Sequence, residues 1–139
     1  MKNSNPRSSI PSNSEHWFEE ALVLARRAAQ EDEVPVGAIV VKDAQIIGKG
    51  YNRREKDNNP IAHAEVLAIQ EAAHQLGSWR LIGCTLFVTL EPCPMCLAAC
   101  QQARLDQVVY GAIDPKGGAL SLGYGLNEDK RTNHRFPAI

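Results

Sequence analysis

The first regular pattern of apolar positions begins after residue 13. Trp17, Ala21, Leu24 and Ala28 recur at steps of three and four residues. This spacing gathers apolar side chains on one face of a helix, so it predicts an amphipathic helix that starts at Ser14 and ends near residue 30. Ser14 is a suitable N-cap for this helix.

Extended segments follow this helix. The runs 34–41 and 46–51 are rich in β-branched residues and are joined by a polar turn, which predicts a β-hairpin. After the polar loop 52–60, helices and strands alternate: helix 63–76, strand 84–90, helix 94–103 and strand 107–111. This order predicts an α/β fold in which a mixed sheet carries helices on both faces. Beyond residue 114 no further element is predicted.

Length and composition indicate one globular domain. The chain has 139 residues, 44% of them hydrophobic and 22% charged, which is enough for a core without disulfide staples. We expect a flexible N-terminal tail at residues 1–13 and a single domain at residues 14–139. No apolar run is long enough to cross a membrane, and the tail has no apolar centre typical of a secretory signal, so we expect a cytoplasmic protein.

Two of the four cysteines, Cys93 and Cys96, form a C-x-x-C pair in a chain without an export signal, which favours metal binding over a disulfide. Such a pair alone is typical of a structural zinc knuckle or a redox site. His63, thirty residues earlier, adds a third zinc ligand. A closed structural site would need a fourth ligand, for which Cys84 or Cys100 is available. Burial as small apolar side chains is the alternative for these two cysteines.

Glu65 changes the interpretation of this ligand set. Catalytic zinc keeps three protein ligands and an open position at which water becomes hydroxide near neutral pH. Residues two apart on a helix point in different directions, so Glu65 is poorly placed to bind the metal beside His63. A free carboxylate next to such a site can take a proton from water and deliver protons to a departing amine. The sequence therefore predicts a hydrolytic deaminase with Glu65 as its catalytic acid and base.

The chain resembles the zinc-dependent cytidine/deoxycytidylate deaminase superfamily, whose H-x-E and P-C-x-x-C signature it carries, and within it the bacterial tRNA-specific adenosine deaminases. The resemblance covers about residues 17–135. Its segments, in order, are 33–38, 50–53, 62–65, 88–93, 108–112, 114–118 and 133–135. It implies a three-layer α-β-α cytidine-deaminase-like fold with a mixed five-stranded sheet. The family usually continues past the Asn-His-Arg segment with a helix and a basic tail, whereas four residues follow it here.

The resemblance also implies an activity. In this family zinc hydroxide attacks the purine carbon that bears the amine, which converts adenosine to inosine at the wobble position of a tRNA anticodon. It implies Zn²⁺ as cofactor, the tRNA anticodon stem-loop as partner, and a homodimer. By resemblance, zinc is bound by His63, Cys93 and Cys96, and Glu65 shuttles protons. The substrate-binding residues implied are Val34, Asn52, Asp114, Lys116 and Asn133.

Two other functions remain open. The motif Pro-Cys-Pro-Met-Cys also occurs in relatives that deaminate a free base or nucleoside of the guanine or cytosine type. A structural zinc module that binds RNA or protein without catalysis is the alternative outside enzymes. The net charge of −1 excludes a uniformly basic nucleic-acid binder, although Lys and Arg concentrate at 49–56 and 116–135.

Overall fold

The computed structural model describes residues 11–139. Residues 1–10 of the predicted N-terminal tail lie outside the described part of the chain. Helix α1 (Ser14–Gln30) has the predicted bounds, but its N-cap is Asn13 and not Ser14. Ser14 is already part of the helix, and its hydroxyl donates a hydrogen bond back to the carbonyl of Pro11. Asn13 takes the non-helical position with a φ of 66°.

A mixed sheet forms the middle layer. Its strands are β1 (Gly37–Lys42), β2 (Gln45–Tyr51), β3 (Thr85–Leu90) and β4 (Gln107–Ala112). Their spatial order is β2-β1-β3-β4, with β1 antiparallel to β2 and β3, and β3 parallel to β4. Asp43 and Ala44 form the predicted hairpin turn, both with positive φ, as a two-residue turn that matches the strand twist requires.

The sheet differs from the predicted one in its number of strands. Residues 11–139 form four strands and not five. Beside β4, at the place of a fifth strand, the segment 137–139 runs parallel to it and exchanges backbone hydrogen bonds with Val108 and Tyr110. The pairing amounts to a single bridge between Val108 and Ala138, because too few residues run along β4 to build a ladder.

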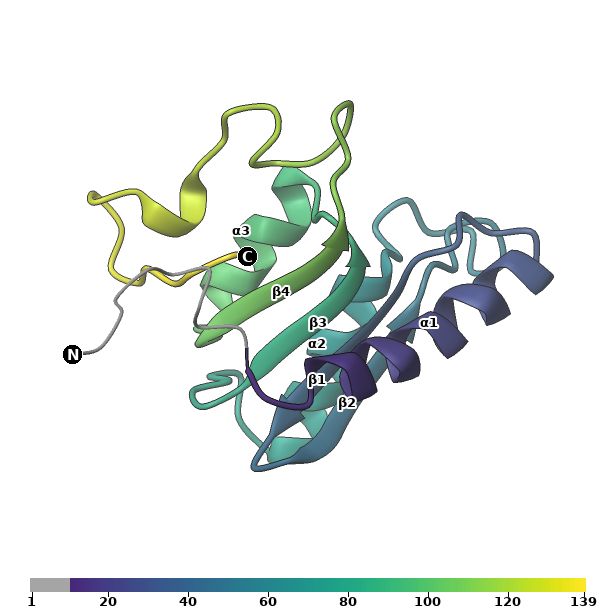
Figure 1. Cartoon of the computed structure of the whole chain (residues 1–139), viewed down its shortest axis with the longest axis horizontal. Helices are drawn as coiled ribbons and strands as arrows, with labels where there is room; N and C mark the ends of the chain where they lie inside the picture. Colours follow the sequence, from purple (N-terminus) through teal and green to yellow (C-terminus); the bar gives the residue numbers. More distant parts are fainter. Residues whose placement is uncertain (1–10) are drawn as a thin grey trace.

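Helices cover both faces of this sheet, as predicted (Figure 1). Helix α1 packs on one face, where Trp17 and Phe18 lie against Phe87. Helices α2 (Ala64–Leu76) and α3 (Pro94–Gln102) cover the other face over the larger core cluster. Gly77 ends α2 in the left-handed conformation that is common at the C-terminus of a helix. A short 3₁₀ helix, η2 (Leu126–Glu128), lies in the segment after β4, where no element was predicted.

The strand directions bring four chain segments to one edge of the sheet. Because β1 is antiparallel to β2 and β3, the start of β1 meets the ends of the other strands: Gly37 pairs with Tyr51, and Ala38 with Val88. The end of β4 lies at the same edge, where Leu90 pairs with Ala112. Residues just outside these strand ends therefore share one site. None of the helices described is both long and apolar enough to span a membrane.

Candidate active site

A pocket of about 150 Å³ opens at this edge of the sheet. Val34 precedes β1, Asn52 follows β2, Glu91 follows β3 and Asp114 follows β4. All four line the pocket. The remaining lining residues are Val36, Arg54, His63, Glu65, Leu90, Cys93 and Gly117. Six of the nine residues predicted for metal binding, catalysis or substrate binding line this pocket: Val34, Asn52, His63, Glu65, Cys93 and Asp114.

Three potential metal ligands converge beside the pocket. His63 is the N-cap of α2 and Cys93 is the N-cap of α3, so both side chains stand at helix starts. His63 Nδ1 lies 3.7 Å from Cys93 Sγ and 3.4 Å from Cys96 Sγ, and the three donor atoms all lie within 4.8 Å of one another. One imidazole and two thiols at these distances can hold a metal ion.

The start of α3 favours a thiolate at Cys93. A hydrogen bond from the Cys96 thiol lowers the pKa of Cys93 to about 5, against the opposing effect of burial. The backbone N–H groups of Cys96 and Met95 act in the same direction, as expected for the first turn of a helix. The same hydrogen bond and burial raise the pKa of Cys96. One thiolate is therefore available before a metal ion binds.

Glu65 lies on the first turn of α2 and is only 4% exposed. Burial raises the pKa of its carboxyl to about 7. It lines the pocket but does not belong to the group of potential ligands. A buried carboxyl that titrates near neutral pH can both accept and donate a proton.

Asn52 and Val34 form walls of the pocket. Asn52 is buried, and its side-chain oxygen accepts a hydrogen bond of 2.8 Å from the backbone N–H of Ala64. This bond fixes the amide at the start of α2 and leaves its NH₂ group as a donor. Val34 is 49% exposed, because it lies before β1 and not within a strand as predicted.

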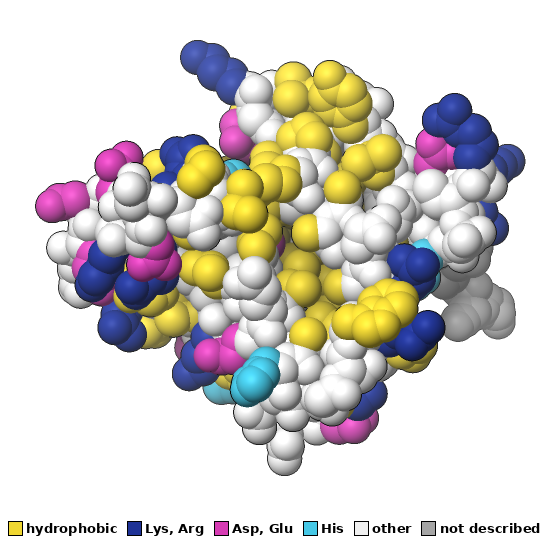
Figure 2. Space-filling view, turned by 180° about the vertical axis from the view of Figure 1, so that it is seen from behind, with side chains coloured by type: hydrophobic (Ala, Val, Ile, Leu, Met, Phe, Trp, Pro, Cys, Tyr) yellow, Lys and Arg dark blue, Asp and Glu magenta, His cyan; other side chains and the backbone are white. Residues whose placement is uncertain are grey.

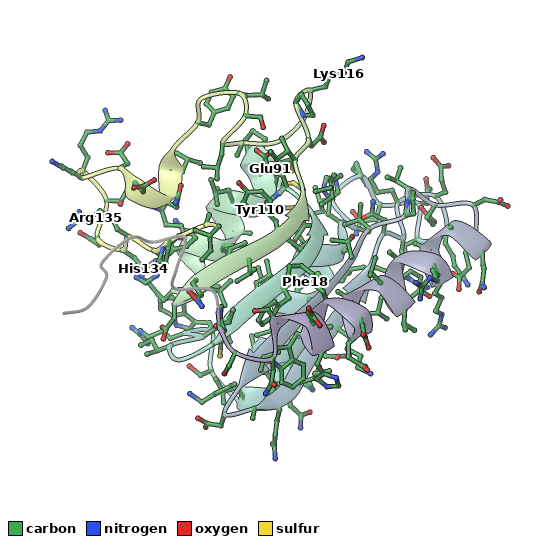
Figure 3. All side chains as sticks on the ribbon, viewed as in Figure 1. Phe18, Glu91, Tyr110, Lys116, His134 and Arg135 are labelled. Carbon is green, nitrogen blue, oxygen red and sulfur yellow. The ribbon has the colours of Figure 1, made fainter. Side chains whose placement is uncertain are left out.

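Of the other predicted substrate-binding residues, one lines the pocket and two lie outside it. Asp114 lines the pocket. Lys116 extends from the tip of the loop after β4 and is exposed (Figure 3). Asn133 lines a separate hollow of about 240 Å³ with Arg104 and Arg131. Its neighbour His134 has a structural role: Nε2 lies 2.6 Å from the carbonyl of Leu105, and the ring stacks on Phe136.

Five residues that line the pocket were not predicted as site residues: Val36, Arg54, Leu90, Glu91 and Gly117. Glu91 directly precedes the Pro-Cys-Pro-Met-Cys segment. Its position after a buried strand was the one feature of the sequence that could have identified it as a site residue. Cys84 and Cys100 are buried and lie outside the group of potential ligands among residues 11–139. Burial raises the pKa of both thiols, which disfavours the thiolate that binds a metal.

Comparisons with known proteins agree with this geometry. A family model for MafB19-like deaminases matches residues 12–138. The chain is 46% identical over 125 residues to the tRNA-specific adenosine deaminase of Bacillus subtilis (strain 168), across 90% of this chain and 78% of that protein. It is 50% identical over 119 residues to the enzyme of the same name from Agrobacterium fabrum (strain C58), across 86% and 78%.

Two solved structures extend the comparison. One, from a study of A-to-I editing by tRNA:A34 deaminases at the wobble position of transfer RNA, superposes with a TM-score of 0.85 at 44% identity, covering 90% of this chain and 91% of that chain. The guanine deaminase of Bacillus subtilis superposes with a TM-score of 0.71 at 40% identity, covering 79% and 69%.

Proposed function

The chain belongs to the MafB19-like deaminase family and groups within it with the tRNA-specific adenosine deaminases, and we propose that it converts adenosine to inosine at the wobble position of a tRNA anticodon. The observation that carries this proposal is the convergence of His63, Cys93 and Cys96 beside the buried carboxyl of Glu65. The substrate class, adenosine in tRNA, comes from the relatives that are named tRNA-specific adenosine deaminases.

We propose zinc as the metal. A tetrahedral zinc ion with bonds of about 2.3 Å to sulfur and 2.0 Å to nitrogen places sulfur and nitrogen about 3.5 Å apart. The sulfurs of Cys93 and Cys96 lie 3.7 and 3.4 Å from His63 Nδ1, so the donor set fits this ion. A zinc ion bound by these three residues would supply a Lewis acid that lowers the pKa of a water molecule to near neutrality.

Glu65 handles the protons of the reaction. Its carboxylate takes a proton from the attacking water, whose oxygen forms a bond to the purine carbon that bears the amine. The carboxylic acid then gives this proton to the ring nitrogen. In a second transfer the carboxylate takes the proton of the newly formed hydroxyl group and gives it to the amine, so that the carbon–nitrogen bond breaks, a carbonyl forms and ammonia leaves. A pKa of about 7 suits both directions of transfer.

The pocket itself favours a single base. Its volume of about 150 Å³ is below the roughly 300–1,000 Å³ of sites that enclose a drug-sized ligand. A flat base fits inside, held by Asn52 through the amide NH₂ and packed against Val34, while ribose and phosphates stay outside. Arg54 lines the same pocket and forms no ion pair within residues 11–139, so it is available to a phosphate next to the base. A base extruded from an anticodon loop meets these conditions.

We also propose a homodimer in the cytoplasm, where tRNA is available. Several large apolar side chains are more than a third exposed, among them Met95, Ile113, Leu122 and Tyr124. Viewed from behind, hydrophobic side chains are spread over the middle of the molecule, and most Lys and Arg side chains lie near its margin (Figure 2). An apolar centre with a charged rim is typical of a protein interface.

The substrate is tested by incubating zinc-loaded protein with an anticodon stem-loop that bears a wobble adenosine, and separately with free nucleosides and bases. We expect inosine only in the stem-loop, detected by mass spectrometry of the digested RNA, and none in a matched stem-loop with guanosine at that position. A free-base deaminase is the second candidate, because the guanine deaminase of Bacillus subtilis shares 40% identity with this chain. Product from free bases alone contradicts the tRNA proposal.

A further inference from the structure

A buried carboxylate holds the loop after β4. Glu91 is only 3% exposed and follows the last residue of β3. Its carboxylate accepts hydrogen bonds from the backbone N–H of Asp114 at 3.0 Å and of Ser121 at 2.8 Å, and from the Ser121 hydroxyl at 2.6 Å. No ion pair is formed by Glu91 within the described residues. Glu91 therefore depends on this loop for its hydrogen-bond donors.

These bonds supply the buried carboxyl group of Glu91 with three hydrogen-bond donors, all of them from this loop. A buried charge is costly unless it is hydrogen-bonded, so a loop that moved away would leave the carboxylate without partners. The loop and the carboxylate thus stabilise each other.

The loop is wrapped closely around Glu91. A Cβ atom on Gly118 would lie 2.1 Å from Glu91 Cδ, so no other residue fits there without displacing the carboxylate. On the other side, the N–H of Ala119 donates to the carbonyl of Pro92 at 2.8 Å, one residue before the potential ligand Cys93. Figure 3 shows Glu91 at the end of β3, below the loop whose tip carries Lys116.

The same loop forms one wall of the pocket through Asp114 and Gly117. The Asp114 carboxylate accepts the N–H groups of Lys116 at 3.2 Å and Gly117 at 3.1 Å, so the two wall residues move as a unit. We propose that Glu91 is a positioning residue that fixes this wall relative to Cys93 and so sets how the substrate base is held. This inference rests on the proposed deaminase function, and it assigns Glu91 no proton transfer.

A double-mutant cycle tests the proposal. Glu91→Gln keeps the shape of the side chain but replaces one acceptor oxygen with an NH₂ group, which cannot accept the hydrogen bonds of the loop. We expect kcat/KM to fall about tenfold, chiefly through KM, because a displaced wall holds the substrate poorly. In an Asp114→Ala background the same substitution is expected to cost less than about threefold, since the residue it positions is already gone. Equal losses in both backgrounds, or no loss in either, contradict the proposal.

A second measurement does not depend on activity. In Glu91→Gln we expect hydrogen exchange at the amides of Asp114 and Ser121 to become about tenfold faster, while the amides of β3 remain protected. Unchanged exchange at these two amides overturns the inference. Asp106→Asn is the matched control, since Asp106 accepts the N–H of Gly83 at 2.9 Å away from the pocket. Its exchange at Ser121 and its KM are expected to match those of the unmodified protein.

The two proposals fail in different ways. If the protein deaminates a free base and not the stem-loop, the tRNA proposal fails, and the cycle is measured with that base. If RNA is deaminated normally but Glu91→Gln leaves KM and loop exchange unchanged, only the positioning role fails.

Discussion

At the scale of single residues, the most specific prediction concerns Glu65. Glu65→Gln preserves the volume of the side chain but removes its ability to take up and release a proton. We expect deamination to fall by about 10²–10⁴-fold, the range of general acid–base catalysis, with about one zinc ion still bound per chain. Product formation is measured in single turnovers, and zinc by atomic emission.

The matched control for Glu65 lies on the same helix. Glu71 is exposed and accepts the N–H of Lys49 at 2.9 Å, so Glu71→Gln removes a carboxylate of α2 that does not line the pocket. Its activity is expected to stay within about twofold of the unmodified protein. Full activity in Glu65→Gln would falsify the proposed role of Glu65.

Residues differ in how far the sequence determines their place. His63, Cys93 and Cys96 carry a recognisable spacing, and each lies at or near a helix start that the local pattern predicts. Glu91 was missed because its partners are two main-chain N–H groups and one hydroxyl group of a loop without periodicity, and such bonds cannot be recognised from residue spacing. The location of Asn133 depends on how the segment after β4 packs, which the local pattern did not predict.

At the scale of elements, the contact between β2 and α2 positions one half of the site. A Cβ atom on Gly50 would lie 2.2 Å from the carbonyl oxygen of Ala64, in the first turn of α2. Gly50→Ala therefore pushes the helix start away from the sheet. We expect a loss of about 1–3 kcal/mol in the free energy of unfolding, measured by denaturant titration, together with weaker zinc binding through His63.

Gly77→Ala is the control for Gly50→Ala, because it strains the backbone at the other end of α2 without displacing His63. Gly77 ends the same helix with a φ of 72°, and a Cβ atom there would meet nothing within 4 Å. The substitution is expected to cost about 1 kcal/mol through backbone strain and to leave zinc affinity unchanged. Equal zinc affinities in the two alanine variants contradict the positioning of His63 by this contact.

The pattern of apolar residues predicted some helices and strands of this fold but not others. The helices and the hairpin were predicted because each buries one face or a continuous run in the core. The fifth strand was implied by family resemblance, and within residues 11–139 only the short segment 137–139 lies beside β4. The 3₁₀ helix η2 was missed, since three residues are too few to establish a periodic pattern.

At the scale of the whole molecule, the potential metal ligands join the starts of α2 and α3, which otherwise meet through side-chain packing. A metal ion that binds the folded chain and not the unfolded chain stabilises the fold by mass action. With free zinc at 100 times its dissociation constant, the gain is about 2.7 kcal/mol. For a domain of this size the melting temperature then rises by roughly 8 °C. Differential scanning calorimetry of chelated and zinc-loaded protein measures this shift.

Two variants and one control show whether the rise in melting temperature comes from zinc bound by the proposed ligands. Cys96→Ser replaces a buried residue that we propose as a ligand and is expected to abolish the zinc-dependent rise. Glu65→Gln is expected to retain it, because Glu65 is not a ligand in our proposal. Cys100→Ser is the matched cysteine control: it removes a buried thiol of the same helix that lies outside the ligand group, so it lowers stability with and without zinc by the same amount. A zinc-dependent rise that is lost in Cys100→Ser but kept in Cys96→Ser would assign the metal to a different set of ligands. The pattern across the three variants therefore tests the whole site through the stability of the fold, independently of any substrate.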